Sequence, residues 1–236
     1  MDMAGNQMVE PAINDARMAA YTTPRPDVSA MVPPTAMRIL DVGCSNGALG
    51  GSLRASVQGR KVEGIEGSSI LAAEAEKHLD RVICADLNHF SWSDNFAAES
   101  FDCMIFADVL EHLVDPWQQL KAAATCLRKD GCIIISLPNI RHITSFVSIF
   151  VHGTFPRRSR GIFDNTHLRW FTLKDATSLI NEAGLTISAI DSSLRFRDQG
   201  GGFLNKLTIK AFSPIQNFYP VREFFTYQYC IRAVKA

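Results

Sequence analysis

The sequence lacks an excess of charge of either sign, because 24 basic residues balance 24 acidic residues and the formal net charge at pH 7 is zero. A strongly charged surface, of the kind that binds nucleic acid or an anionic membrane, is therefore not expected. A long hydrophobic run is also missing. The longest apolar stretch, Ile143–Val151, is far too short to cross a bilayer. We expect neither a nucleic-acid partner nor an integral membrane segment.

Paired cysteines are missing as well. The six cysteines form no C-x-x-C pair, so the sequence predicts no structural zinc site, and no metal ion is expected. The first ten residues lack the basic start and the apolar stretch of a secretory signal. Unpaired thiols without such a signal predict a cytoplasmic protein.

The sequence contains an alternation of short β-prone runs with longer amphipathic stretches, which begins at Met37. This alternation predicts an α/β fold, in which helices cover both faces of a parallel sheet. The predicted strands are Met37–Val42, Lys61–Ile65, Arg81–Ala85, Phe101–Ala107, Cys132–Leu137, Leu185–Ile190 and Tyr227–Val234. The predicted helices are Ala48–Val57, Ser68–Leu79, Pro116–Leu127 and a segment that begins after its N-cap Thr172 and ends at Gly184.

Residues 1–36 lie outside this alternation. Four prolines interrupt them, so only a stretch near Asn14–Tyr21 is expected to be helical. We therefore divide the chain into an N-terminal arm, residues 1–36, and a main domain, residues 37–236. The main domain carries two insertions, at about residues 138–170 and 200–226, where the pattern loosens.

A glycine turn, Gly43–Gly47, joins the first predicted strand to the first predicted helix. The backbone of such a turn can approach a ligand closely, and the helix that follows offers free N–H donors. The turn is ambiguous by itself, because glycine there often serves turn geometry alone. It also satisfies G-x-S-x-G, the nucleophile elbow of α/β-hydrolases, with His167 as a late triad histidine. However, the earlier strands and the upstream oxyanion loop that accompany an elbow are absent.

Two acidic residues follow at the ends of the next two predicted strands, Glu66 and Asp86. Ligands of open α/β sheets bind at the carboxyl ends of strands, where an acid can accept ribose hydroxyls. The second carboxylate could accept the adenine amino group. Together with the turn, the two acids predict an adenosine site. Ser45 replaces the glycine that makes room for pyrophosphate in dinucleotide sites, which favours S-adenosylmethionine over NAD.

Several motifs resemble those of class I S-adenosylmethionine-dependent methyltransferases. Ile39–Gly47 resembles motif I, with Ser45 where glycine is commoner, and the segments ending in Glu66 and Leu87 resemble the ribose and adenine motifs. Phe101–Leu113 is similar to the strand-four motif of the subgroup that contains ubiquinone-biosynthesis O-methyltransferases and MetW-like proteins. Asp164–Thr172 is typical of MetW-like bacterial methyltransferases, which often accompany sugar or cell-envelope biosynthesis.

The resemblance implies a Rossmann-like, doubly wound sheet of seven strands, mostly parallel with an antiparallel last strand. It implies S-adenosylmethionine as the cofactor, with the N-terminal arm folded over the cofactor site and the two insertions on the acceptor side. The expected cofactor-binding residues are Tyr21, Arg25, Asp41, Gly43, Cys44, Ser45, Gly47, Glu66, Gly67, Asp86, Leu87, Ala107, Asp108 and Leu110.

The expected activity is methyl transfer to an oxygen or nitrogen of a small molecule, such as a sugar or cell-envelope precursor. His112 is a candidate base, and His167 with Arg169 could supply a base and an anion clamp. Each of the three also has a structural interpretation, as a side chain that bonds a backbone carbonyl or Asp164. One alternative function stays open, that of a non-catalytic cofactor-binding partner protein of MetW type. A homodimeric assembly also stays open.

Overall fold

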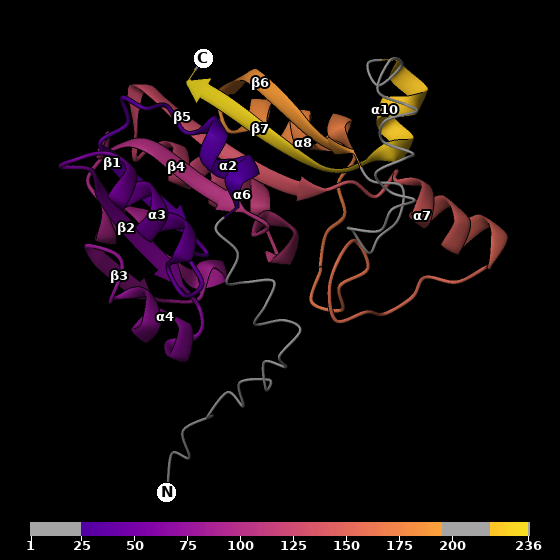
Figure 1. Cartoon of the computed structure of the whole chain (residues 1–236), viewed down its shortest axis with the longest axis horizontal. Coiled ribbons are helices and arrows are strands. Elements are labelled where there is room, and N and C mark those ends of the chain that lie inside the picture. Colours follow the sequence, from indigo (N-terminus) through magenta and orange to yellow (C-terminus); the bar gives the residue numbers. More distant parts are fainter. Residues whose placement is uncertain (1–24, 195–217, 236) are drawn as a thin grey trace, which may run out of the picture.

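The computed structural model describes residues 25–194 and 218–235, which form a seven-stranded sheet in the order β3-β2-β1-β4-β5-β7-β6 (Figure 1). The strands are β1 Arg38–Val42, β2 Lys61–Glu66, β3 Arg81–Cys84, β4 Phe101–Ala107, β5 Leu127–Pro138, β6 Leu185–Leu194 and β7 Thr226–Lys235. Strands β1 to β5 pair in parallel, whereas β7 runs antiparallel to both β5 and β6. The predicted sheet, with its antiparallel last strand, is confirmed.

Helices cover both faces of this sheet. The α-helices are α2 Pro26–Met31, α3 Ala48–Ser56, α4 Ser69–Ala75, α5 Trp92–Asn95, α6 Pro116–Ala124, α7 Ile143–Phe146, α8 Leu173–Glu182 and α10 Tyr219–Phe225. The remaining helical segments are the 3-10 helices η1 Leu87–His89 and η2 Leu110–His112 and the π-helix η3 Val147–Val151.

Strand β4 shows how the two faces are filled. Cys103 and Ile105 pack with residues of α2 and α3, whereas Met104 and Phe106 pack with residues of α6 and α8 on the other face. All four side chains are fully buried. A strand buried on both faces needs a continuous apolar run, which is the pattern that predicted it.

Most predicted elements are found within a few residues of their predicted ends. Helix α8 begins after Thr172, whose hydroxyl accepts from the Asp175 backbone N–H while the Asp175 carboxylate accepts from the Thr172 N–H. This reciprocal capping box confirms the predicted start of the helix.

The description of the N-terminal arm was incomplete. Helix α2 begins at Pro26, where a proline is favourable because the first helical N–H has no partner within the helix. It anchors the arm through Val28, which is fully buried against the sheet. The prediction that only Asn14–Tyr21 would be helical was therefore wrong, because it treated every proline as a helix breaker. The stretch Asn14–Tyr21 lies outside the described residues.

The segment between β5 and α8 extends away from the sheet (Figure 1). It contains α7 and η3 and exposes Phe146, Phe150, Val151 and Phe155. Its inner part is held by a small apolar cluster in which Ile162 and Phe163 pack on Tyr227 of β7. Within the described residues, no helix is both long enough and apolar enough to cross a membrane.

Candidate functional site

The predicted glycine turn is bonded to the end of strand β2. The backbone N–H groups of Gly43 and Cys44 donate to the Ile65 carbonyl at 2.8 and 3.0 Å. The next N–H, that of Ser45, donates to Glu66 Oε2 at 2.8 Å, and the Ser68 N–H donates to the other carboxylate oxygen at 2.9 Å. The turn and the first predicted acid therefore form one hydrogen-bonded unit.

The backbone of the turn is left-handed at three positions. The φ angles are 73° at Gly43, 51° at Ser45 and 79° at Gly47. A Cβ at Gly43 would lie 2.5 Å from Val109 Cγ2, so only glycine lets the turn pack on the loop after β4. Ser45 adopts a left-handed conformation that costs a side chain about 1 kcal/mol relative to glycine.

The side chains of Asp41, just before the turn, and Cys44, within it, are buried. The Asp41 side chain is 2% exposed, and its Oδ2 has no hydrogen-bond partner among the residues that the structure describes. Burial, followed by the nearby charge of Glu66, raises the pKa of Asp41 to about 7. The Cys44 thiol is buried against Gly64, so Cys44 contributes its backbone, and not its thiol, to the turn.

Arg25 joins the arm to the loop after β4. Its guanidinium pairs with the Asp108 carboxylate, donates to Ser136 Oγ at 2.9 Å, and pairs with Asp27 at 2.8 Å. Gln228 of β7 also donates to Asp108. The predicted residues Arg25 and Asp108 are thus in direct contact, with Asp108 held at a φ of 58°. Sequence reasoning missed Ser136 and Gln228 because they lie far along the chain from Arg25 and Asp108. It missed Asp27 because this residue belongs to the unpredicted helix α2.

Within the described part of the chain, the remaining predicted cofactor residues lie at or after the ends of β2, β3 and β4. Asp86 caps η1 by accepting from the Asn88 N–H at 2.9 Å and contacts His89 Nδ1 at 3.0 Å. These bonds outweigh burial and lower the pKa of Asp86. Leu110 is fully buried in the core, so its side chain supports the loop from below. Tyr21 lies outside the described residues, whereas Gly67, Leu87 and Ala107 each follow or end a strand of the same edge.

The structure brings His112 and His167 together, although they belong to different segments. Their rings are 4.7 Å apart between centroids and nearly perpendicular. His112 Nδ1 lies 3.3 Å from the Thr166 carbonyl, and His167 Nδ1 lies 3.2 Å from the Ile162 carbonyl. Burial, followed by the neighbouring His112, lowers the pKa of His167 to about 4. His167 is therefore neutral at pH 7.

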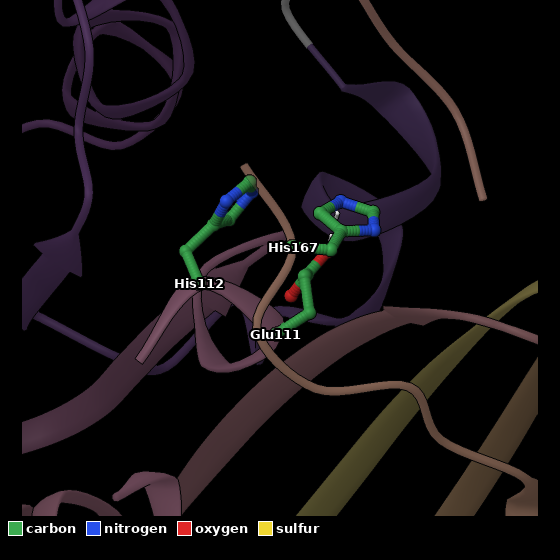
Figure 2. A group of neighbouring side chains, drawn as sticks. All are labelled: Glu111, His112 and His167. Carbon is green, nitrogen blue, oxygen red and sulfur yellow. Dashed lines mark ion pairs between the residues drawn. The ribbon is translucent and has the colours of Figure 1, made fainter. Parts of the chain in front are cut away.

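Glu111 lies beside this pair and was not among the predicted site residues. Figure 2 shows its side chain beneath His167, with Oε1 4.0 Å from His167 Nε2. The side chain is 1% exposed, and neither carboxylate oxygen has a hydrogen-bond partner within the described part of the chain. Burial, and then the charge of Asp108, hold the pKa of Glu111 well above its usual range. The sequence signal that could have found Glu111 is an acidic residue flanked by two apolar residues, Leu110 and Leu113, which are both buried in the structure.

Arg169 is placed differently from the two histidines. It is exposed, and its guanidinium donates to the Val114 carbonyl at 2.6 Å and to the Leu168 carbonyl at 3.2 Å. The backbone N–H groups of Leu168 and Arg169 both donate to the Glu111 carbonyl. These bonds tie the segment that carries His167 to the loop after β4, with Arg169 at the rim.

The chain matches the family model described as "Methyltransferase domain" over residues 16–190. A ubiquinone biosynthesis O-methyltransferase of Cereibacter sphaeroides is 29% identical over 163 residues, which are 67% of this chain and 64% of that relative. One of Xanthomonas axonopodis pv. citri is 34% identical over 115 residues, 48% of this chain and 47% of the relative. The chain thus spans about half to two thirds of the curated relatives it matches.

Solved structures share the fold at low identity. A protein of Thermotoga maritima, described as a SAM-dependent methyltransferase and possible histamine N-methyltransferase, superposes with a TM-score of 0.61 at 16% identity, over 92% of this chain and 89% of that one. A S-adenosylmethionine dependent methyltransferase of Mesorhizobium loti superposes with a TM-score of 0.60 at 15% identity, over 88% and 95%. Identities this low show a common architecture.

Proposed function

Because this chain belongs to the methyltransferase domain family, which its match over residues 16–190 establishes, we propose that it transfers a methyl group from S-adenosylmethionine to a small-molecule acceptor. One observation carries the proposal: the Glu66 carboxylate is bonded to the glycine turn and stands at the edge where β1, β2 and β4 end. A nucleoside bound at that edge would meet the turn and the acid together.

The residues at this edge fit the cofactor. Each Glu66 oxygen accepts one backbone N–H and keeps a second lone pair, which can accept a ribose hydroxyl. Asp86 is half-exposed and can take the adenine amino group. The buried Asp41, whose pKa is about 7, would ionise more readily beside a cation, and the cofactor carries an ammonium and a sulfonium.

The arm completes the site in this proposal. Arg25 and Asp108 form the wall next to the methionine portion. The further assignment, that Tyr21 or Arg25 binds the cofactor's carboxylate, rests on the sequence alone for Tyr21, which lies outside the described residues. The turn, from Gly43 to Gly47, supplies backbone N–H groups to the same portion. The proposed contacts are completed by Gly67, Leu87, Ala107 and Leu110. If Tyr21→Phe and Arg25→Ala both leave the affinity for S-adenosylmethionine unchanged, the assignment to the arm is wrong.

When bound, the cofactor supplies an activated methyl group, and the protein's task is to align the acceptor and remove its proton. His112 and His167 face each other where β4 ends, so a neutral imidazole of this pair can accept a hydroxyl proton. Arg169 at the rim is the proposed contact for an anionic group on the acceptor. We take oxygen as the acceptor atom, because the curated relatives are O-methyltransferases.

The acceptor class is tested by turnover. Untagged protein is incubated with S-adenosylmethionine and one acceptor at a time, and the demethylated cofactor is measured. Phenolic precursors of the ubiquinone type are the first class to try. Sugar and cell-envelope precursors are the second, because the basic residues Arg157 to Arg160 could bind a linked phosphate. If the protein binds the cofactor but forms no product with either class of acceptor, the result would favour a non-catalytic partner protein.

Assembly and location are tested separately. We propose a cytoplasmic protein in which each chain carries a complete site, so that a homodimer is not required for binding. Size-exclusion chromatography with light scattering gives the mass in solution, and fractionation of cells gives the location.

A further inference from the structure

Glu111 is a buried carboxyl group that the proposed cofactor site does not use. Both of its oxygens are shielded from solvent, and neither has a hydrogen-bond partner in the described part of the chain. Its nearest basic group is His167 Nε2 at 4.0 Å from Oε1, which is too long for a hydrogen bond. A buried carboxylate without partners is costly, so an ordinary structural role would leave this side chain badly placed.

The two histidines use the same ring nitrogen, Nδ1, to bond a backbone carbonyl. A carbonyl oxygen only accepts, so the bonds from His112 Nδ1 to the Thr166 carbonyl and from His167 Nδ1 to the Ile162 carbonyl place a hydrogen on each Nδ1. Each neutral ring then carries its lone pair on Nε2. Metal-binding histidines are oriented in this way, with the other ring nitrogen bonded to a backbone carbonyl.

The three side chains converge. One ligand atom from each of Glu111, His112 and His167 lies within 4.8 Å of the others, and within the described residues no other group of three histidine, cysteine or acidic side chains does so. Figure 2 shows the three gathered on one side of the loop after β4. Ligand atoms about 2.0–2.2 Å from a tetrahedral zinc ion lie closer together than this, so small side-chain rotations would close the site.

From this arrangement, we propose that Glu111, His112 and His167 bind a divalent transition-metal ion, with Zn²⁺ as the fitting ion. Two histidines and one carboxylate, with a fourth position left for another ligand, are a donor set of catalytic zinc sites. The same donor set also suits Fe²⁺, so the donors define the class of ion, a divalent transition metal, more firmly than they define the element. The sequence predicted no metal because the ligands are not paired cysteines.

The role of the ion rests on the proposed function. The open position would take the acceptor hydroxyl, whose proton then leaves to solvent more readily. The resulting oxygen anion forms the new bond to the methyl carbon while the carbon–sulfur bond breaks, and that electron pair stays on sulfur. With the ion bound, the Nε2 lone pairs of His112 and His167 are engaged, so these side chains position the acceptor. The direct base role proposed above for this pair then applies only to the metal-free protein.

The test is metal binding by untagged protein that has been freed of metal with a chelator. Co²⁺ is titrated in and followed by its visible absorption, and Zn²⁺ is used to displace it. We expect one Co²⁺ per chain, without the thiolate absorption that binding at Cys84 would give. Glu111→Gln and His167→Gln should each weaken binding by about 100-fold or more. His152→Gln, at an exposed histidine elsewhere, should leave binding unchanged.

Thermal unfolding separates a ligand role from a structural one. If Glu111 serves the metal, metal-free Glu111→Gln should melt no lower than metal-free wild type, and added Zn²⁺ should raise the melting temperature of wild type only. The proposal would be overturned if wild type bound no Co²⁺, or if Glu111→Gln and His167→Gln bound Co²⁺ as tightly as wild type does. S-adenosylmethionine binding is measured on the same samples: if it persists when metal binding fails, only the metal site is wrong.

Discussion

The two ends of the candidate site are built in different ways. On the cofactor side, Glu66 is held by backbone N–H groups of Ser45 and Ser68, and the turn is shaped by left-handed residues. On the acceptor side, Glu111 has no such partners and faces His167, which arrives from the segment after β5. In our proposal, backbone N–H groups therefore shape the side that binds the cofactor, whereas side-chain donors shape the side that binds the acceptor.

The largest effect should come from filling the close contact at the turn. Gly43→Ala would place a methyl group 2.5 Å from Val109 Cγ2, in addition to the strain of a φ of 73°. We expect a loss of about 3 kcal/mol in the free energy of unfolding. Gly153→Ala on the acceptor side, with a φ of 64° and open space around it, should lose only about 1 kcal/mol. Equal losses in urea denaturation would contradict the packing of the turn.

A second test uses the buried carboxyl just before the turn. Because the pKa of Asp41 is raised to about 7 in the fold, the native state holds its proton more tightly than the unfolded chain does. Its stabilising contribution is present below the ordinary pKa and is lost as the pH rises through 7. Asp41→Asn should therefore gain about 2 kcal/mol relative to wild type between about pH 5 and about pH 8.5. If the difference in the free energy of unfolding between Asp41→Asn and wild type were the same at both pH values, the pKa of Asp41 would not be raised in the fold.

A matched pair of carboxylates compares the two sides directly. Glu66→Gln should weaken S-adenosylmethionine binding by about 1–2 kcal/mol, because the amide keeps only one acceptor oxygen. Glu111→Gln should leave that affinity unchanged, since Glu111 serves the acceptor side in our account. Isothermal titration calorimetry measures both. An effect of Glu111→Gln as large as that of Glu66→Gln would mean that the two sides are not separate.

The smallest expected effect is at the N-terminal cap of helix α8, which belongs to neither side of the candidate site. Thr172→Ala removes one half of the capping box and should cost about 1 kcal/mol of stability. Methyl transfer and cofactor affinity should not change. A thermal melt and one turnover assay are sufficient, and a fall in activity without a fall in stability would extend the acceptor side to this helix.

The same contrast explains how far the sequence could predict the structure. Strand β4 could be found because a strand buried on both faces is apolar throughout, and Glu66 could be found because its place at a strand end follows from chain order. Helix α2 was missed because a proline at the first helical position looks like a breaker in a proline-rich arm. The meeting of Glu111 with His167 was missed because it depends on the path of an insertion, which has no periodic pattern.

The most direct test of the central claim is a calorimetric titration of S-adenosylmethionine into the untagged chain. Our account predicts one site per chain, weakened by Glu66→Gln and unaffected by Glu63→Gln, a carboxylate on the same strand that pairs with Arg81 instead. NAD should give no binding heat. Failure of S-adenosylmethionine to bind, or binding of NAD in its place, would contradict the account.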